Sequence, residues 1–313
     1  MTGPTASQLD VTEAPAPPAG EALLRAVPER VYDAYLFDLD GTIYLGEELL
    51  PGALRMLQHL REAGRRVVFL SNNPTLDRAM YVSKLTNLGV SVTPDDVVNS
   101  VVSMVAWLGR EHPGKIVYPI AEQPLIAALR DAGIPMSSNP DEIEIVLASY
   151  DRGFDYAKLQ IAFDALWKRD SAILVATNLD RYCPLPGGRG EPDAAAIVAA
   201  IEACTGATCV ANAGKPSVIM LETVMATLGL RPDQCLMTGD RLYTDVKMAV
   251  DAGMHSALVL TGDADLDLVA STAAADLPTY ILDRVDHVIP WALRQQLGWS
   301  DAPSPNLLAI QPR

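Results

Sequence analysis

Short apolar runs alternate with amphipathic stretches over most of the chain. The runs predict strands over 33–39, 65–71, 115–120, 142–149, 171–177, 235–240 and 256–262. The amphipathic stretches predict helices over 51–63, 75–89, 97–109, 122–132, 155–169, 192–204, 217–229 and 244–254. Short β-rich runs separated by helices are typical of a parallel sheet covered on both faces, so the predicted fold class is α/β.

The alternation is interrupted once. The segment "EHPGK" at 111–115 has the turn residues of a boundary, a second alternating unit follows it, and the first pattern then resumes. This arrangement predicts a discontinuous core over 31–112 and 211–297, with an inserted α/β domain over 113–210 that can act as a lid. Residues 1–30 and 298–313 are expected to be tails, the first of them disordered because it is rich in Pro, Ala and acid.

Composition excludes several classes of protein. The net charge of −15, from 39 acids against 24 bases, argues against nucleic-acid binding and against docking on anionic membranes. The four cysteines form no CxxC pair and the four histidines have no zinc-site spacing, so a reduced, cytoplasmic protein is the simplest interpretation. We see no signal-peptide pattern at the start and no apolar run long enough to span a bilayer.

Polar and charged residues gather where the predicted core strands end. In open parallel sheets, ligands bind outside the carboxyl ends of the strands. The residues at these ends are Asp38, Asp40 and Gly41 after the first strand, Ser71, Asn72 and Asn73 after the second, Lys215 after the insertion, and Asp240 and Asp245 near the last helix. Each could be a turn or capping residue by itself, but turn chemistry does not account for the same residue types at four strand ends.

This set suits phosphate chemistry. Asp38, Asp240 and Asp245 would repel one another at one edge, and a hard divalent cation such as Mg²⁺ would relieve that repulsion. The metal and Lys215 could then bind a dianionic phosphate. A carboxylate that the metal leaves available can attack phosphorus, and Asp40 can protonate the leaving oxygen and later activate water. Gly41 would let the backbone approach the phosphate, whereas no complete Walker A or GxGxxG sequence is present.

Four motifs in order resemble those of the haloacid dehalogenase-like (HAD) hydrolase superfamily. They are DLDGT at 38–42, the strand-end Ser71, Lys215, and GDRLYTD at 239–245, and the resemblance covers nearly all of 33–295. With its long insertion, the sequence most resembles the subgroup that has a large α/β cap. That subgroup includes NagD-type nucleotidases and p-nitrophenyl, phosphoglycolate and pyridoxal phosphatases. The resemblance implies a Rossmann-like parallel-sheet core and a cap that selects the leaving group.

The resemblance also implies residue roles. Asp38 would be the nucleophile and a Mg²⁺ ligand, and Asp40 the general acid/base, with its backbone carbonyl on the metal. Asp240 would bind the metal and Asp245 would support that site. The phosphoryl group would be held by Gly41, Ser71, Asn72, Asn73 and Lys215. The substrate would be a small phosphate ester, such as a sugar phosphate, phosphoglycolate, pyridoxal phosphate or a nucleoside monophosphate.

Two expectations concern the inserted domain. In "ATNLDRYCPLPGG" at 176–188, Asn178, Asp180 or Arg181 is expected to approach the substrate, although a plain surface loop fits the same residues equally well. Relatives often dimerise through the cap, so the resemblance also implies a homodimer.

Three other functions remain alternatives. A phosphotransferase or phosphomutase would use the same residues with a second acceptor in place of water. A non-catalytic phosphate-binding regulator would retain the same scaffold. A receiver-type signalling module also uses Asp, Mg²⁺ and Lys on a parallel sheet, but it fits in one small domain, whereas Lys215 lies far from Asp38 in this sequence.

Overall fold

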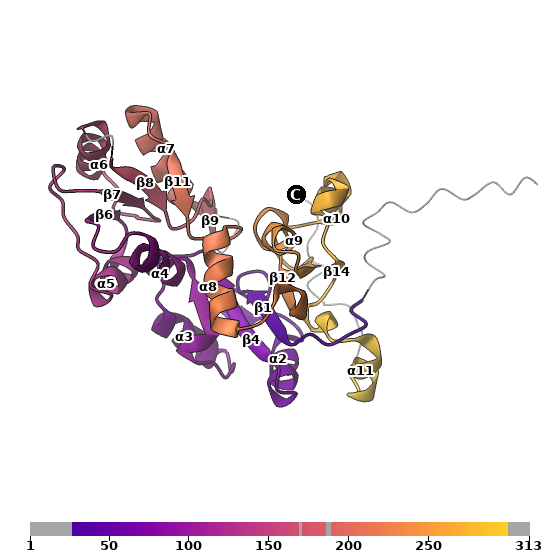
Figure 1. Ribbon diagram of the computed structural model, residues 1–313. Helices are drawn as coiled ribbons and strands as arrows, with labels where there is room; N and C mark the ends of the chain where they lie inside the picture. Colours follow the sequence, from indigo (N-terminus) through magenta and orange to yellow (C-terminus); the bar gives the residue numbers. More distant parts are fainter. Residues whose placement is uncertain (1–26, 169–170, 186–188, 300–313) are drawn as a thin grey trace, which may run out of the picture.

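The computed structural model describes residues 27–168, 171–185 and 189–299 (Figure 1). Its strands are β1 (Ala34–Asp38), β2 (Tyr44–Leu45), β3 (Glu48–Leu49), β4 (Arg66–Ser71), β5 (Val97–Asn99), β6 (Val117–Ile120), β7 (Ile145–Ala148), β8 (Ile173–Ala176), β9 (Tyr182–Leu185), β10 (Arg189–Pro192), β11 (Cys209–Asn212), β12 (Cys235–Gly239), β13 (His255–Val259) and β14 (Tyr280–Leu282). Its α-helices are α2 (Ala53–Glu62), α3 (Arg78–Asn87), α4 (Ser100–Glu111), α5 (Gln123–Asp131), α6 (Tyr156–Lys168), α7 (Ala194–Thr205), α8 (Val218–Leu228), α9 (Lys247–Asp251), α10 (Leu266–Ser271) and α11 (Trp291–Gln296). Among the described residues, no helix is long and apolar enough to cross a membrane.

The larger sheet has six parallel strands in the order β14-β13-β12-β1-β4-β5. Successive side chains of β1 point to opposite faces, as the two-residue period of a strand requires. Tyr35 and Phe37 pack with α2 and α3, whereas Ala34 and Leu36 pack with α8 and α9. Because both faces are covered, β1 is apolar throughout until Asp38 at its carboxyl end.

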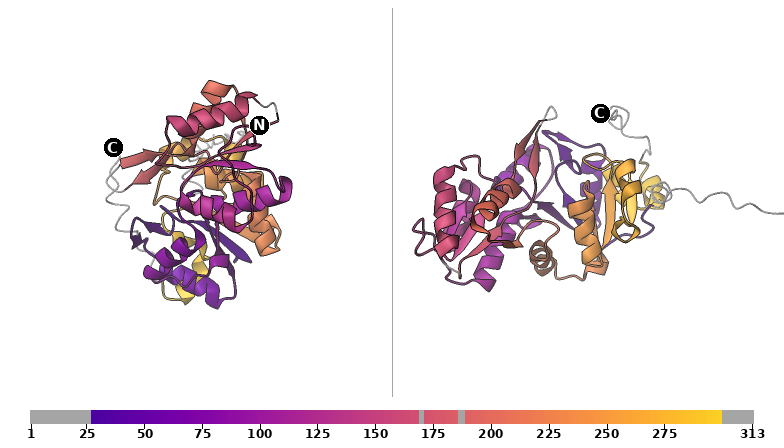
Figure 2. Two further views of the ribbon diagram at one scale, coloured as in Figure 1. Left: turned by 90° about the vertical axis from the view of Figure 1, so that its left-hand side faces the viewer. Right: turned by 90° about the horizontal axis from the view of Figure 1, so that it is seen from above.

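A second sheet, also parallel, has the strand order β11-β8-β7-β6. Helices α4 and α5 cover one face, and α6 and α7 cover the other. The antiparallel hairpin of β9 and β10 extends from this layer. Figure 2 shows the two sheets, each with its own helices, as two lobes side by side.

The chain leaves the first sheet after β5 and returns to it through α8 and β12, so the second sheet is inserted in the first. This confirms the predicted fold class, a parallel α/β core with an inserted α/β domain. Strand β11 belongs to the second sheet and spans the boundary predicted between 210 and 211. The tails predicted over 1–30 and 298–313 lie almost entirely outside the described residues.

Some local predictions were wrong. The helix expected over 97–109 begins only at Ser100, because Val97–Asn99 pairs with β4 as an edge strand and the Asn99 side chain caps the helix. Likewise, α3 begins after Asp77, whose side chain accepts a hydrogen bond from the Met80 amide, and not after Thr75. The short strands β11 and β14 and the β9–β10 hairpin were not predicted.

The helix expected over 244–254 is replaced by two shorter elements. A π-helical turn, η3 (Leu242–Val246), follows β12, and α9 comes after it. The wide turn folds Asp245 back against the end of β12, so closely that a Cβ on Gly239 would lie 2.2 Å from the Asp245 carboxyl carbon. A glycine is therefore required at 239, and the turn places Asp245 at the sheet edge where β1 ends.

Candidate active site

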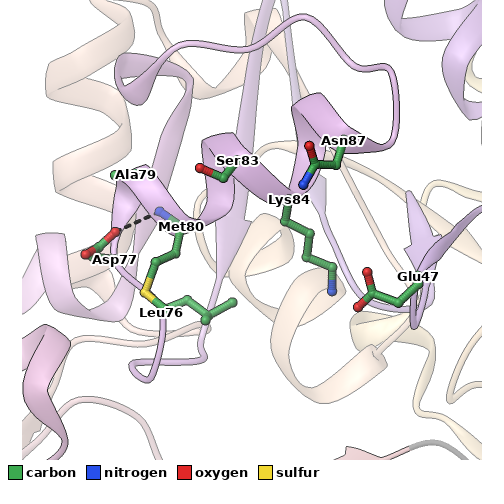
Figure 3. A pocket seen from close by; sticks show the side chains of 8 residues that line it. All are labelled: Glu47, Leu76, Asp77, Ala79, Met80, Ser83, Lys84 and Asn87. Atoms are coloured by element: carbon green, nitrogen blue, oxygen red, sulfur yellow. Dashed lines mark hydrogen bonds between the residues drawn. The ribbon is translucent and has the colours of Figure 1, made fainter.

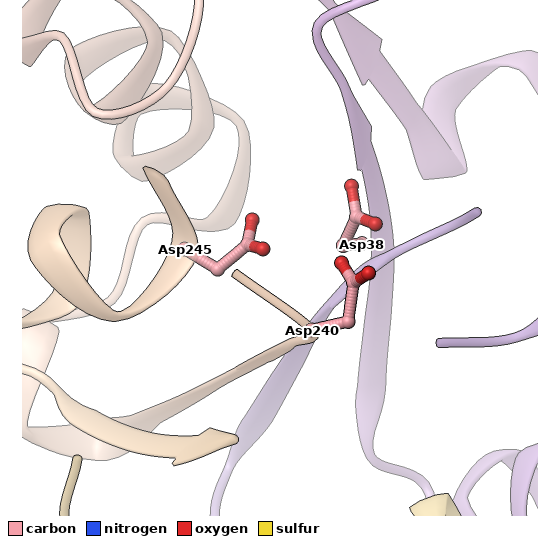
Figure 4. A group of neighbouring side chains, drawn as sticks. All are labelled: Asp38, Asp240 and Asp245. Atoms are coloured by element: carbon pink, nitrogen blue, oxygen red, sulfur yellow. The ribbon is translucent and has the colours of Figure 1, made fainter. Parts of the chain in front are cut away.

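Three carboxylates meet where β1 and β12 end. The oxygens of Asp38, Asp240 and Asp245 lie within 4.8 Å of one another (Figure 4). β1 and β12 are adjacent and parallel, so their carboxyl ends share one edge of the sheet. Asp240 and Asp245 are buried and Asp38 is half-buried. The structure thus brings together the three acids expected to repel one another.

Lys215 stands between two of these acids. Its ammonium group donates hydrogen bonds to Asp38 and, over 2.7 Å, to Asp245 Oδ1. Burial by itself lowers the pKa of Lys215, but Asp245 and Asp38 outweigh it and hold that pKa above its ordinary value. The buried side chain of Lys215 is therefore positively charged at neutral pH.

One lysine does not balance the three acids at this edge. Burial raises the pKa of Asp38 well above its ordinary value, and Asp245 and Asp240 add to that rise while Lys215 opposes it. Burial also raises the pKa of Asp240, with Asp245 adding to it. In addition, Asp240 Oδ1 is buried and has no hydrogen-bond partner among the described residues. A cation with oxygen ligands fits this group, because it would supply both the missing charge and the missing partner.

The loop after β13 supports Asp240 from the other side. The Asp263 amide donates to Asp240 Oδ2 over 2.8 Å, and the Thr261 hydroxyl donates to the Gly41 carbonyl over 2.6 Å. A Cβ on Gly262 would lie 2.0 Å from Asp240 Oδ2, and one on Gly41, at φ +78°, would lie 2.5 Å from it. Sequence reasoning missed this loop, although "TGD" at 261–263 stands at the end of the strand predicted over 256–262, as other site residues stand at the ends of theirs.

Asp40 lies under the β2–β3 hairpin. The Tyr44 hydroxyl donates to Asp40 Oδ2 over 3.3 Å, and Lys84 Nζ lies 3.8 Å from the centroid of the Tyr44 ring. Burial raises the pKa of Asp40, and Lys84 partly opposes that rise. An acid with a raised pKa is suited to giving up and regaining a proton. In Figure 3, Lys84 and Glu47 point toward one another across a surface hollow of about 480 Å³ beside α3.

The segment after β4 is held by its own hydrogen bonds. Ser71 Oγ lies 2.7 Å from the Tyr81 hydroxyl and accepts a hydrogen bond from the Asn73 amide over 3.2 Å. Asn73 Oδ1 accepts from both the amide and the hydroxyl of Thr75. Asn72 points instead to the Lys215 segment, where its Oδ1 accepts from the Lys215 amide over 2.7 Å. Of the residues expected to hold phosphate, Asn72 therefore contacts Lys215, and Ser71 contacts Asn73.

Three residues of the inserted domain were expected to approach the substrate, and the structure places them differently. Asn178 and Asp180 are buried, whereas Arg181 is exposed. Asn178 Nδ2 donates to Asp180 over 3.1 Å and to Asp193 over 3.0 Å. Asp180 also reaches the core, because Asn72 Nδ2 donates to its Oδ2 over 2.9 Å. The side chains of Asn178 and Asp180 are therefore already engaged with protein groups.

Asp193, which caps α7 and accepts from Asn178, should make stability depend on pH. Burial raises the pKa of Asp193 to about 6, from an ordinary value of 3.8. The folded protein therefore binds this proton more tightly than the unfolded chain, and stability falls as pH rises between those values. We expect Asp193→Asn to gain about 2 to 3 kcal/mol relative to wild type between pH 4 and pH 7 in urea unfolding.

Asp131→Asn, at the exposed end of α5, is the matched control for loss of a carboxylate and should show no such change. An equal Asp193→Asn effect at both pH values would contradict the prediction.

Comparison with known proteins agrees with the fold. Residues 35–135 match the family model of haloacid dehalogenase-like hydrolases, and residues 212–288 match a second, HAD-hydrolase-like model. The sugar-phosphatase AraL of Bacillus subtilis is 35% identical over 253 residues, which cover 81% of this chain and 90% of that protein.

Two solved structures extend the comparison to the inserted domain. A 4-nitrophenylphosphatase from Thermotoga maritima superposes with a TM-score of 0.76 at 31% identity, covering 82% of this chain and 96% of that one. A glycerol phosphate phosphatase from Mycobacterium tuberculosis, solved with magnesium, gives 0.74 at 29% identity, covering 82% and 76%.

The chain therefore belongs to the haloacid dehalogenase-like hydrolases. Within that family it is a phosphatase of the NagD and p-nitrophenylphosphatase type.

Proposed function

We propose that this phosphatase hydrolyses small phosphate monoesters through an aspartyl-phosphate on Asp38. The observation that carries the proposal is the cluster of Asp38, Asp240 and Asp245 around the ammonium group of Lys215. In the first step a carboxylate oxygen of Asp38 attacks phosphorus, and the bond from phosphorus to the leaving oxygen breaks. Asp40 gives its proton to that oxygen, which leaves as an alcohol.

In the second step water attacks the phosphorus of the aspartyl-phosphate. Asp40 takes a proton from the water, the bond from phosphorus to Asp38 breaks, and inorganic phosphate leaves. The side-chain carboxylate of Asp38 and the acid form of Asp40 are thereby restored, so the cycle consumes one water and one ester. The Lys215 ammonium group is hydrogen-bonded to Asp38, so it would lie beside the transferred phosphoryl group as a fixed positive charge.

The cation that fits the cluster is proposed to be Mg²⁺. Asp38, Asp240 and the Asp40 carbonyl would hold it, and Asp245 would support them. When bound, it supplies positive charge against which the phosphate oxygens can be placed. The orphaned Asp240 Oδ1 supports this proposal, as does the related glycerol phosphate phosphatase solved with magnesium.

The leaving group is proposed to lie between core and cap. A hollow of about 670 Å³ separates the start of α3 from the ends of β6 and β7, with Thr75, Asp77, Glu122 and Asp151 among its lining residues. Met80, Ala121, Pro124 and Ala127 line the hollow too, so it offers both polar and apolar contacts. The proposed preference for hydroxylated leaving groups rests on the relatives named for sugar phosphates and glycerol phosphate. The division into a core (31–112, 211–297) and a cap (113–210), the cap-mediated homodimer and the cytoplasmic location are parts of the same proposal.

Phosphate release from a panel of esters tests this function. With Mg²⁺ present, sugar and glycerol phosphates should give a higher kcat/KM than p-nitrophenyl phosphate, and excess EDTA should abolish release from all of them. Adding alcohol or sugar acceptors should not change the rate. If turnover required an acceptor, a phosphotransferase would replace the hydrolase. Absence of phosphate release from every ester would favour a regulatory protein.

A further inference from the structure

One carboxylate of the inserted domain, Asp180, contacts both sides of the catalytic edge. It lies between β8 and β9 and is only 8% exposed. Its Oδ2 accepts from Asn72 Nδ2 over 2.9 Å, and Asn72 follows β4 in the core. Its Oδ1 lies 3.8 Å from Arg241 Nη1, and Arg241 follows β12. β1, which carries Asp38, lies between β4 and β12 in the sheet.

The contact with Asn72 continues to the catalytic lysine. The Lys215 amide donates to Asn72 Oδ1 over 2.7 Å, and Asn72 Nδ2 donates to the Lys215 carbonyl over 3.1 Å. These two hydrogen bonds fix the orientation of the Asn72 carboxamide. Its Nδ2 also donates to Asp180. The Lys215 side chain in turn binds Asp38. Hydrogen bonds on the Lys215 backbone and on its side chain therefore link the cap, through this one residue, to the proposed nucleophile.

Gly214 is tightly packed between Asn178 of the cap and Asn72 of the core. A Cβ on Gly214 would lie 2.8 Å from Asn178 Cβ and 3.0 Å from Asn72 Oδ1. Gly214 precedes Lys215 on the segment that returns from the cap to the core. Cap and core are thus in van der Waals contact around Asn72, and Asp180 can reach both of its core partners only while its segment rests against the core.

We propose that Asp180 is a positioning residue that holds the cap closed, together with Asn72 and Arg241, and that its contact with Asn72 sets the place of the Lys215 segment. We call these three residues the cap latch. Asp180 touches no reacting atom; it acts through Asn72 on Lys215. The inference rests on the proposed function for its kinetic readout only, since the state of the cap latch can be measured without substrate.

Kinetics of graded variants give the first test. Asp180→Ala removes both core contacts, and a charge-assisted hydrogen bond of this kind corresponds to roughly a 10- to 100-fold loss in kcat/KM. Asp180→Asn keeps an acceptor for Asn72 but loses the charge facing Arg241, so its loss should be smaller. Asp164→Asn, on α6 and half-exposed, is the matched control and should stay within about twofold of wild type. An Asp180→Ala enzyme as active as wild type would overturn the proposal.

Hydrogen exchange in the metal-free protein gives the second test, and it does not depend on activity. In Asp180→Ala, the amides of residues 72, 73, 75 and 213–215 should exchange at least about tenfold faster, while amides of β7 and β8 keep their protection. Uniformly faster exchange over the whole cap, with a lowered Tm, would show that Asp180 only stabilises the cap fold, and would also overturn the proposal. A wild type without phosphatase activity would refute the proposed function and leave this measurement to decide on the cap latch.

Discussion

Asp38→Asn should release phosphate at least about 10⁴-fold more slowly than the wild type with any ester. An amide cannot form the aspartyl-phosphate, so the loss should fall on kcat and not on KM. The variant should nevertheless fold. Burial raises the pKa of Asp38, which means that the folded protein disfavours a charge at this place, and an uncharged amide of the same shape removes it. Initial rates with Mg²⁺, together with the Tm of the metal-free protein, measure both effects.

Asp33→Asn is the matched control for this change. Asp33 precedes the other end of β1 and is paired with Arg65 at the surface. Its replacement should leave turnover within about twofold of wild type. Turnover by Asp38→Asn within tenfold of wild type, in protein free of deamidated product, would rule out Asp38 as the nucleophile.

Lys215→Met should destabilise the metal-free protein by about 3 to 5 kcal/mol at neutral pH. It removes the buried cation that both Asp38 and Asp245 contact and leaves their charges uncompensated. The loss should shrink as pH falls, because the raised pKa of Asp38 lets the folded protein take up a proton in place of the lost cation. Excess Mg²⁺ should recover part of the stability, since it binds only the folded site. Urea unfolding at several pH values, with and without Mg²⁺, measures the loss of stability, its pH dependence and its recovery by the metal.

Lys247→Met separates this effect from the general loss of a lysine. Lys247 makes an exposed ion pair with Asp251 on α9, and exposed pairs of this kind add little to stability. Its free energy of unfolding should therefore be close to that of wild type at every pH. A Lys215→Met protein equally stable with and without Mg²⁺ would argue against a cation site beside the lysine.

The general architecture could be predicted because several core strands are apolar runs that end in recognisable polar residues. The apolar run into Asp38 and the pair Gly239-Asp240 are local signals, and the parallel arrangement alone brings their ends together. The inserted domain was visible for a similar reason, since it repeats the strand and helix periods between two boundaries. These features need no knowledge of tertiary contacts.

The remainder depends on contacts that no local pattern contains. The three residues of β5 are too few to show a period, and their apolar character merges with the helix that follows. The role of Asn72 arises only when the Lys215 segment returns beside it. Tyr44 reaches Asp40 from a hairpin, and Lys84 reaches the Tyr44 ring from a helix that meets the hairpin only in the folded protein. Sequence alone therefore placed the acids and the lysine, but not the groups that orient them.

The pairing of β1 with β12 has a consequence for the order in which the chain is assembled. Synthesis delivers β1 early, yet Ala34 must wait for Cys235 before that side of the strand is hydrogen-bonded. At the usual pace of translation this interval is on the order of 10 to 40 s. β4 and the whole cap emerge meanwhile, so a nascent chain can complete the cap before the catalytic edge exists. During that time β1 presents an open apolar edge, the kind of surface that chaperones protect and that aggregation exploits.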